Sequence, residues 1–162
     1  SDYIEQRQAA PDFKNAFLKI FPSKLLDIPY DDFPHGVIHG DLYYDNSLFN
    51  EGEIVTLIDF EQAGTGRFIL DIGISISGSC LNKAKDNIDP DLLNAFLSGY
   101  AKSLKLSPIE IRYLNTAIIV GFFSIGLWRI KRFLEGNLDE TRKHNYRELI
   151  DRALAFYREF GL

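Results

Sequence analysis

Residues 36–60 read GVIHGDLYYDNSLFNEGEIVTLIDF, and they give the clearest local signals of the fold. It contains three short β-prone runs, at 36–39, 47–49 and 54–58. The turn residues between the last two runs predict a β-hairpin, because Asn, Glu and Gly interrupt two runs of β-branched and aromatic residues. A hairpin returns the chain to its starting point, so the loops before and after it are expected to lie close together.

The polar residues of this stretch follow the pattern H-x-D-x-x-x-x-N and, after the hairpin, I-D-F. Asp41 stands at the end of a predicted strand, where a carboxylate can accept a hydrogen bond from an incoming hydroxyl group. Mg²⁺ prefers hard oxygen ligands, and Asn46 and Asp59 can supply two of them. Protein kinases use the same spacing between catalytic Asp and metal-binding Asn. The pattern therefore predicts a phosphoryl-transfer site, with ordinary turn residues as the alternative.

Outside this stretch the sequence predicts mostly helices, with apolar residues at helical spacing. They are expected at 12–21, 69–80, from Asp89-Pro90 onwards, from the capping box Ser107–Glu110 to about Leu134, and from Asp139 to about Phe160. Residues 22–35 have the composition of a loop, starting with Pro22, and no strand is expected after Gly64 and Gly66. The predicted fold class is α+β, mostly helical, with a small β-hairpin that carries the polar loops.

Composition excludes several classes of protein. The chain has 162 residues, of which 46% are hydrophobic and 25% charged, as in one ordinary globular domain. Its net charge of −5 argues against binding to a nucleic-acid polymer. It has one cysteine, which favours a reducing compartment, and no apolar run long enough to span a membrane. We therefore expect a cytoplasmic protein without a membrane partner.

The polar loop and the I-D-F element resemble those of the aminoglycoside-phosphotransferase and choline-kinase superfamily, which are small-molecule kinases with a protein-kinase-like fold. That superfamily typically has H-G-D, as in residues 39–41, and lacks the Lys that protein kinases place two residues after the Asp. Tyr43 occupies that position here, which argues against a protein substrate. Within the superfamily, residues 36–49 are similar to the homoserine kinase type II signature G-V-I-H-[AG]-D-L-F-x-D-N-x-x-F. The similarity extends from about residue 33 to residue 80, including Cys80.

The resemblance implies a role for each polar residue of the motif. Asp41 would be the catalytic base, and Asn46 and Asp59 would bind Mg²⁺ and, through it, ATP. Asp71 would brace the catalytic loop, and His39 would be a packed structural residue. Tyr43, Tyr44 and Glu61 are candidate acceptor-site residues. Glu61 can hold a substrate ammonium group or serve as a further metal ligand, although an exposed loop acid without such a role is favoured.

The function implied is an ATP-dependent kinase that transfers the γ-phosphoryl group to a hydroxyl of a small metabolite. A homoserine-like acceptor is favoured, with choline, ethanolamine and aminoglycosides as alternatives. Two departures from the homoserine kinase branch fall where a substrate pocket is expected: Glu61-Gln62 replaces aromatic residues, and Ser77-Gly78-Ser79-Cys80 replaces Asn-Ala-Trp-Cys. A pseudokinase-like binding module, a metal-dependent phosphohydrolase and a protein kinase remain competing functions.

Residues 1–162 are expected to form the C-terminal lobe of such a kinase. The Gly-rich loop, strand Lys and helix Glu of an N-terminal ATP-binding lobe are not found in the sequence. The chain also opens on Ser1 and contains no Met, which indicates a fragment. We therefore expect the missing N-terminal lobe to be its partner, and the isolated fragment to be inactive.

Several further residues have a structural and a functional interpretation. Arg129 and Arg132 lie on one predicted helical face, where they can hold an acidic substrate group, although a solvated basic face is favoured. Cys80 is expected to be a small core residue. Core packing is also expected of the aromatic residues Phe122, Phe123, Trp128 and Phe133.

Overall fold

The computed structural model describes residues 10–21 and 28–162, and part of the predicted loop at 22–35 therefore lies outside the described residues. The described helices are α2 (Pro11–Ile20), α3 (Phe68–Ser79), α4 (Pro90–Tyr100), α5 (Pro108–Arg112), α6 (Leu114–Leu134) and α7 (Arg147–Phe160). The described strands are β1 (His35–Ile38), β2 (Ser47–Asn50), β3 (Glu53–Leu57) and β4 (Gly64–Arg67). This confirms the predicted α+β, mostly helical class.

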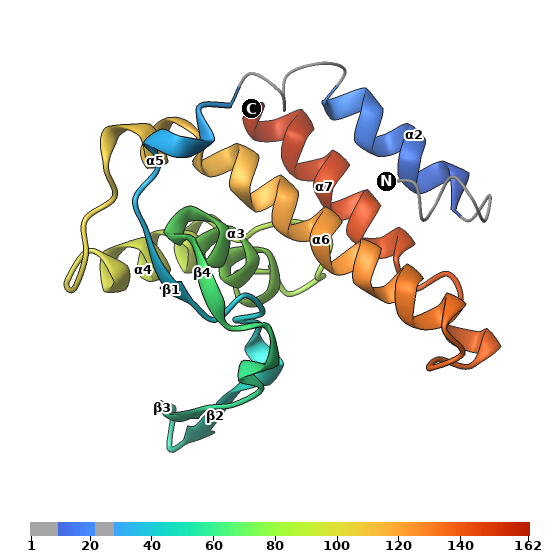
Figure 1. The fold of residues 1–162 in the computed structure, drawn as a ribbon, viewed down its shortest axis with the longest axis horizontal. Helices are drawn as coiled ribbons and strands as arrows, with labels where there is room; N and C mark the ends of the chain where they lie inside the picture. Colours follow the sequence, from blue (N-terminus) through green and yellow to red (C-terminus); the bar gives the residue numbers. More distant parts are fainter. Residues whose placement is uncertain (1–9, 22–27) are drawn as a thin grey trace.

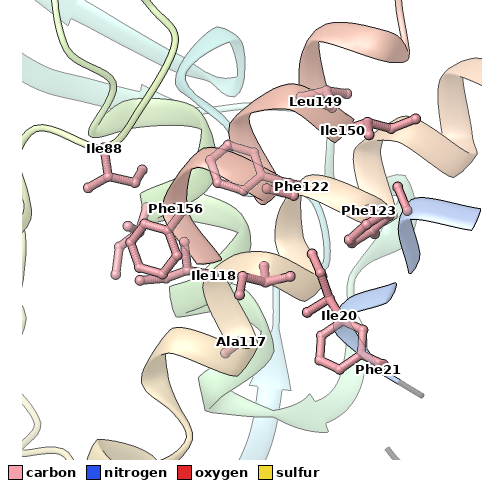
Figure 2. Close-up of a cluster of buried hydrophobic side chains, with 14 of the residues drawn as sticks. Ile20, Phe21, Ile88, Ala117, Ile118, Phe122, Phe123, Leu149, Ile150 and Phe156 are labelled. Carbon is pink, nitrogen blue, oxygen red and sulfur yellow. The ribbon is translucent and has the colours of Figure 1, made fainter. Parts of the chain in front are cut away.

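Helix α6 is the centre of the helical body, which we define as α2, α3, α6 and α7. Figure 1 shows α6 between α3 and α7, with α2 beside α7, and these pairs of helices are in contact. Phe122 of α6 and Phe156 of α7 are fully buried, and Figure 2 shows their rings within one apolar cluster. Glycines allow α3 and α6 to approach closely, because a Cβ atom on Gly73 would lie 2.3 Å from the carbonyl oxygen of Ala117. The described core is therefore built mainly between helices.

The strands form two separate antiparallel pairs. Strands β2 and β3 make the predicted hairpin, which projects away from the helical body in Figure 1. Its turn residues Glu51 and Gly52 have φ values of 50° and 86°, the left-handed pair that a tight two-residue hairpin turn requires. Strand β1 pairs with β4, with His35 opposite Arg67 and Ile38 opposite Gly64.

Strand β4, in which two of four residues are glycine, was not predicted, whereas the expected change to helix after Gly66 is confirmed by α3, which begins at Phe68. Glycine has low β propensity, so the sequence of β4 gives no strand signal. Neighbouring side chains occupy the space that the glycines leave free. A Cβ atom on Gly66 would overlap Ile38, and one on Gly36 would lie 2.6 Å from the ring of Phe68. The side chains of Ile38 and Phe68 fill the space above this pair of strands.

The helix starts are confirmed at two of three predicted positions. The Asp89 side chain caps α4 by accepting from the amides of Asp91 and Leu92, and the capping box of Ser107 and Glu110 begins α5. Asp139, in contrast, caps only the short 3₁₀ turn Glu140–Arg142, and α7 begins later, at Arg147. The buried Tyr146 fixes the chain just before α7, since its hydroxyl donates to Asp12 over 2.7 Å.

The predicted long helix after the capping box is interrupted at Tyr113, where α5 ends and α6 begins. Phe122 and Phe123 are buried as predicted, and so is Cys80. Core packing was wrong for Trp128, which is 44% exposed, and Phe133 is only half-buried. Among the helices of the described part, none combines the length and the apolar character needed to cross a bilayer.

Candidate functional site

The loop between β1 and β2, residues 39–46, is held by one carboxylate from the first turn of α3. Asp71 accepts from the backbone amide of His39 over 2.7 Å with Oδ2, and from that of Gly40 over 2.8 Å with Oδ1. Gly40 has a φ of 81°, and a Cβ atom there would lie 2.5 Å from the carbonyl oxygen of Gln62. The loop therefore needs glycine at this position to pass close to the segment that follows β3.

His39 connects the same loop to the end of the hairpin. Its side chain is buried, and its ring lies 4.5 Å from that of Phe60, centre to centre. Its Nδ1 accepts from the amide of Asp41 at 3.4 Å, so we assign the proton to Nε2, which donates to the carbonyl oxygen of Ile58 over 2.9 Å. Both ring nitrogens have backbone partners, as in a structural histidine.

Asn46 and Asp41 are in direct contact. The Asn46 Nδ2 group donates to the backbone oxygen of Asp41 over 2.7 Å and to its Oδ2 over 3.2 Å. The backbone carbonyl oxygen of Asn46 accepts from the backbone amide of Ile58 over 3.0 Å. Ile58 directly precedes Asp59 in the chain. The hairpin therefore returns Asp59 to the loop that carries Asp41 and Asn46.

Asp59 has a left-handed backbone, with φ 64° and ψ 56°. For a residue with a Cβ atom this conformation costs on the order of 1 kcal/mol, and such strain concentrates at functional sites. The 3₁₀ turn Phe60–Gln62 follows at once and carries Glu61.

The electrostatics of Asp41 reflect this crowded arrangement. Burial is the largest cause that raises the pKa of the Asp41 carboxyl group above its usual value, and the negative charges of Asp59 and Glu61 raise it further. The hydrogen bond from Asn46 acts in the opposite direction, because it stabilises the ionised form. The influence of Asp59 and Glu61 on Asp41 indicates that the three carboxylates lie within electrostatic reach of one another.

A cavity of about 340 Å³, which we call the site cavity, opens beside these groups. Asp41, Asn46 and Asp59 all line it, together with Tyr43 and Glu61. Tyr44 does not line it: that side chain is 55% exposed, and its ring stacks on Phe49 of the hairpin at 5.4 Å. The structure thus brings together five of the six predicted catalytic, metal and acceptor residues.

Tyr43 is positioned by a residue that departs from the homoserine kinase branch. A Cβ atom on Gly78 would overlap the ring of Tyr43, so the ring can lie this close to the helix only because residue 78 is glycine. Burial raises the pKa of the Tyr43 hydroxyl group, and the nearby positive charge of Arg129 partly offsets this effect. Arg152 of α7 acts in the same direction as Arg129, so the charges that act on the Tyr43 hydroxyl group come from both α6 and α7.

Helix α6 forms the part of the cavity wall that the sequence did not predict. Its contribution is a stripe of residues at successive helical turns: Ser124, Ile125, Trp128, Arg129 and Arg132. Both arginines line the site cavity, which supports the alternative interpretation, that they hold an acidic group, over the solvated basic face that the sequence favoured. The i, i+4 spacing of the stripe is the signal from which these residues could have been found.

The pair Asn46 and Asp59 fits the way in which proteins bind Mg²⁺, with few ligands from the protein itself. Within residues 10–21 and 28–162, no group of three His, Cys, Asp or Glu side chains is arranged to hold a metal ion. Mg²⁺ typically takes only one or two carboxylates and completes its shell with phosphate oxygens and water. A single carboxylate and one amide oxygen at the edge of an open cavity fit that pattern.

Comparisons with known proteins point in the same direction. The model of the phosphotransferase enzyme family matches residues 2–108. The homoserine kinase of Polaromonas naphthalenivorans is 32% identical over 104 residues, which are 64% of this chain and 33% of that protein. The homoserine kinase of Neisseria meningitidis serogroup B is 34% identical over 100 residues, which are 62% of this chain and 32% of that protein. The homoserine kinase of Methylorubrum populi is 40% identical over 80 residues, 49% of this chain and 25% of that protein. The chain therefore spans about a third of the length of these relatives, or less.

Proposed function

Because this chain belongs to the phosphotransferase enzyme family, we propose that it forms the acceptor and metal side of an ATP-dependent kinase for a small hydroxylated metabolite. The observation that carries the proposal is the single cavity lined by Asp41, Asn46 and Asp59. In this proposal residues 1–162 act as the C-terminal lobe, and an N-terminal lobe contributes most of the ATP site. The greater length of the matched homoserine kinases supports this division.

Asp41 is the catalytic base in this proposal. Its Oδ2 already accepts from Asn46, so Oδ1 is the atom that receives the proton of the acceptor hydroxyl group. The acceptor oxygen forms a bond to the γ-phosphorus of ATP, and the bond from that phosphorus to the β–γ bridging oxygen breaks. ADP leaves with the electron pair of the broken bond. Positioning and charge stabilisation supply most of the catalysis in such transfers.

Asn46 and Asp59 are the residues that would hold Mg²⁺. The Nδ2 group of Asn46 is used in the contact with Asp41, which orients the Oδ1 atom as the available ligand. Held there, Mg²⁺ would supply positive charge to the phosphate oxygens during phosphoryl transfer.

The favoured acceptor is homoserine, because the matched relatives carry the name homoserine kinase. Homoserine offers a primary hydroxyl group, an ammonium group and a carboxylate group. Glu61 lines the same cavity as Asp41 and has the charge needed to receive the ammonium group. Choline, ethanolamine and aminoglycosides also carry a hydroxyl group and a positive charge, and they remain the competing acceptors.

The test measures ADP formation by the complete protein that contains this chain, with ATP, Mg²⁺ and each acceptor in turn. We expect turnover with L-homoserine, and we expect Asp41→Asn to lower kcat by at least about 100-fold, the scale of a positioned acid–base group. Glu51→Gln, in the exposed hairpin turn, is the matched control and should retain the parent rate. A kcat of Asp41→Asn within tenfold of the parent value would refute the role of Asp41. Phosphate release without any acceptor would identify a phosphohydrolase instead.

A further inference from the structure

The site cavity has charges of both signs, and they come from different elements. The acidic residues Asp41, Asp45, Asp59 and Glu61 lie on the loops at either end of the hairpin. The basic residues Arg129 and Arg132 lie on α6. A cavity of this kind suits a small ligand that itself carries both charges, since each wall then meets the opposite sign.

The charge of Arg129 is already satisfied inside the protein. Its guanidinium group donates to Glu148 over 2.5 Å and to the carbonyl oxygen of Asn145 over 2.8 Å. Glu148 also lies 3.6 Å from Arg152, whose Nε donates to the carbonyl oxygen of Lys85. Arg129 is therefore part of a network that ties α6 to α7.

Arg132 is different, because no carboxylate among the described residues lies within ion-pair distance of it. Its Nε is buried and has no hydrogen-bond partner within the described part of the chain. A buried donor without a hydrogen-bond partner is unfavourable, so such donors are rarely left unsatisfied. The guanidinium group lies 4.7 Å from the centre of the Trp128 ring, and both residues line the site cavity.

We propose that Arg132 binds the carboxylate group of the acceptor substrate, and that the acceptor is therefore a hydroxy acid rather than an amino alcohol. The inference rests on the proposed function, since it requires the hydroxyl group of the same molecule to reach Asp41. A guanidinium fork matches a carboxylate with two parallel hydrogen bonds, which a choline or ethanolamine acceptor cannot form. The exposure of Trp128 follows from the same role, because its ring lies beneath Arg132 at the cavity instead of in the core.

An alternative source of negative charge is a phosphate group of ATP. The two sources differ in which Michaelis constant depends on Arg132, so kinetics separates them. Three acceptor probes share a three-carbon or four-carbon chain with a terminal hydroxyl group: L-homoserine has both charged groups, 4-hydroxybutyrate has only the carboxylate, and 3-amino-1-propanol has only the ammonium. For the complete parent protein we expect a higher kcat/KM for L-homoserine and 4-hydroxybutyrate, which carry the carboxylate group, than for 3-amino-1-propanol, which lacks it.

The decisive variants are Arg132→Gln and Arg132→Lys. We expect Arg132→Gln to raise KM for L-homoserine by about 10- to 100-fold, the scale of a hydrogen bond to a charged group, while KM for ATP stays within about twofold. Arg132→Lys keeps the charge without the fork and should recover part of the loss. Lys131→Gln removes a neighbouring exposed cation that does not line the cavity, and it is the matched control. Thermal unfolding shows whether each variant is folded.

The results distinguish this inference from the proposed function. A rise in KM for ATP with an unchanged KM for L-homoserine would overturn the inference and assign Arg132 to the nucleotide. If no acceptor is turned over, calorimetry with the three probes takes the place of kinetics. Binding of L-homoserine and 4-hydroxybutyrate that Arg132→Gln weakens would support the inference while the kinase proposal fails. Equal binding of 3-amino-1-propanol and 4-hydroxybutyrate would overturn it.

Discussion

The helical body and the β2–β3 hairpin treat their apolar residues in opposite ways. In the helical body Phe122 and Phe156 are fully buried, whereas in the hairpin Phe49 is 46% exposed and Ile54 is 59% exposed. The polar residues of the site lie where the two regions meet, on loops that Asp71 and His39 connect to α3 and to the end of β3. This contrast indicates that the helices provide most of the stability, while the hairpin brings Asp59 back to the loop that carries Asp41. Function on loops that a rigid scaffold positions is a common division of labour.

The largest expected effect compares two phenylalanines, one from each region. We expect Phe122→Ala to lower the free energy of unfolding by about 3–5 kcal/mol, because it leaves a cavity at the centre of the core. Phe49→Ala should lower it by less than about 1 kcal/mol, because nearly half of that side chain is already in water. Urea unfolding of the same chain measures both values. Equal losses in the two variants would contradict the division between the regions.

A smaller effect is expected at Asp71, which joins the regions. Asp71→Asn replaces one acceptor oxygen by an NH₂ group that faces a backbone donor, at His39 or Gly40. We expect this to reduce the free energy of unfolding by about 1–3 kcal/mol and to lower kcat by roughly tenfold, because the loop loses a charged hydrogen-bond partner. Amide hydrogen exchange should become faster at those two residues.

Asp91→Asn is the matched control for Asp71→Asn, since Asp91 is an exposed acid in the first turn of another helix, α4. It should change neither kcat nor the exchange rates in the 39–46 loop. Unchanged exchange at His39 and Gly40 in Asp71→Asn would show that the loop is held by other contacts.

The smallest expected effect on stability at neutral pH concerns Cys80, whose thiol is buried in the helical body. Burial raises the pKa of the Cys80 thiol to about 11, with a further contribution from the charge of Asp89. The thiol form is favoured in the folded state, so its contribution to stability is fully present below the pKa of the unfolded thiol. That contribution is lost as the pH rises through about 11.

At pH 8 we therefore expect native Cys80 to react much more slowly with a disulfide reagent such as Ellman's than it does in urea. Cys80→Ser supplies the blank, because the chain has one cysteine. Equal reaction rates with and without urea would show that the helical body opens to solvent readily.

The local signals of the sequence predicted much of the fold. The hairpin, the caps at Asp89 and Ser107 and the buried helix α3 all follow from patterns within a few residues of one another. Strand β4 could not be predicted in this way, because its reason for being a strand is its pairing with β1, nearly thirty positions earlier in the chain. The late start of α7 likewise depends on a contact between Tyr146 and Asp12 from opposite ends of the chain.

The residues of the site likewise fall into those that a local motif predicted and those that depend on tertiary contacts. The motif predicted Asp41, Asn46 and Asp59, and the structure places all three at one cavity, although their chemical roles stay predictions. The wall from α6 was not predicted, because an arginine next to a tryptophan on a helix has the same local pattern whether it faces water or a cavity. Only the tertiary structure shows that Arg129 has a carboxylate partner and that Arg132 has none among the described residues.

The backbone of Asp59 has a consequence for anyone who engineers this protein. A left-handed residue is a standard target for replacement by glycine, since removing the Cβ atom relieves the strain and commonly raises thermal stability. At position 59 that substitution would also delete the carboxylate proposed to hold Mg²⁺. Screening for heat resistance alone would therefore favour variants that have lost the chemistry, and selection here has to follow turnover together with melting temperature.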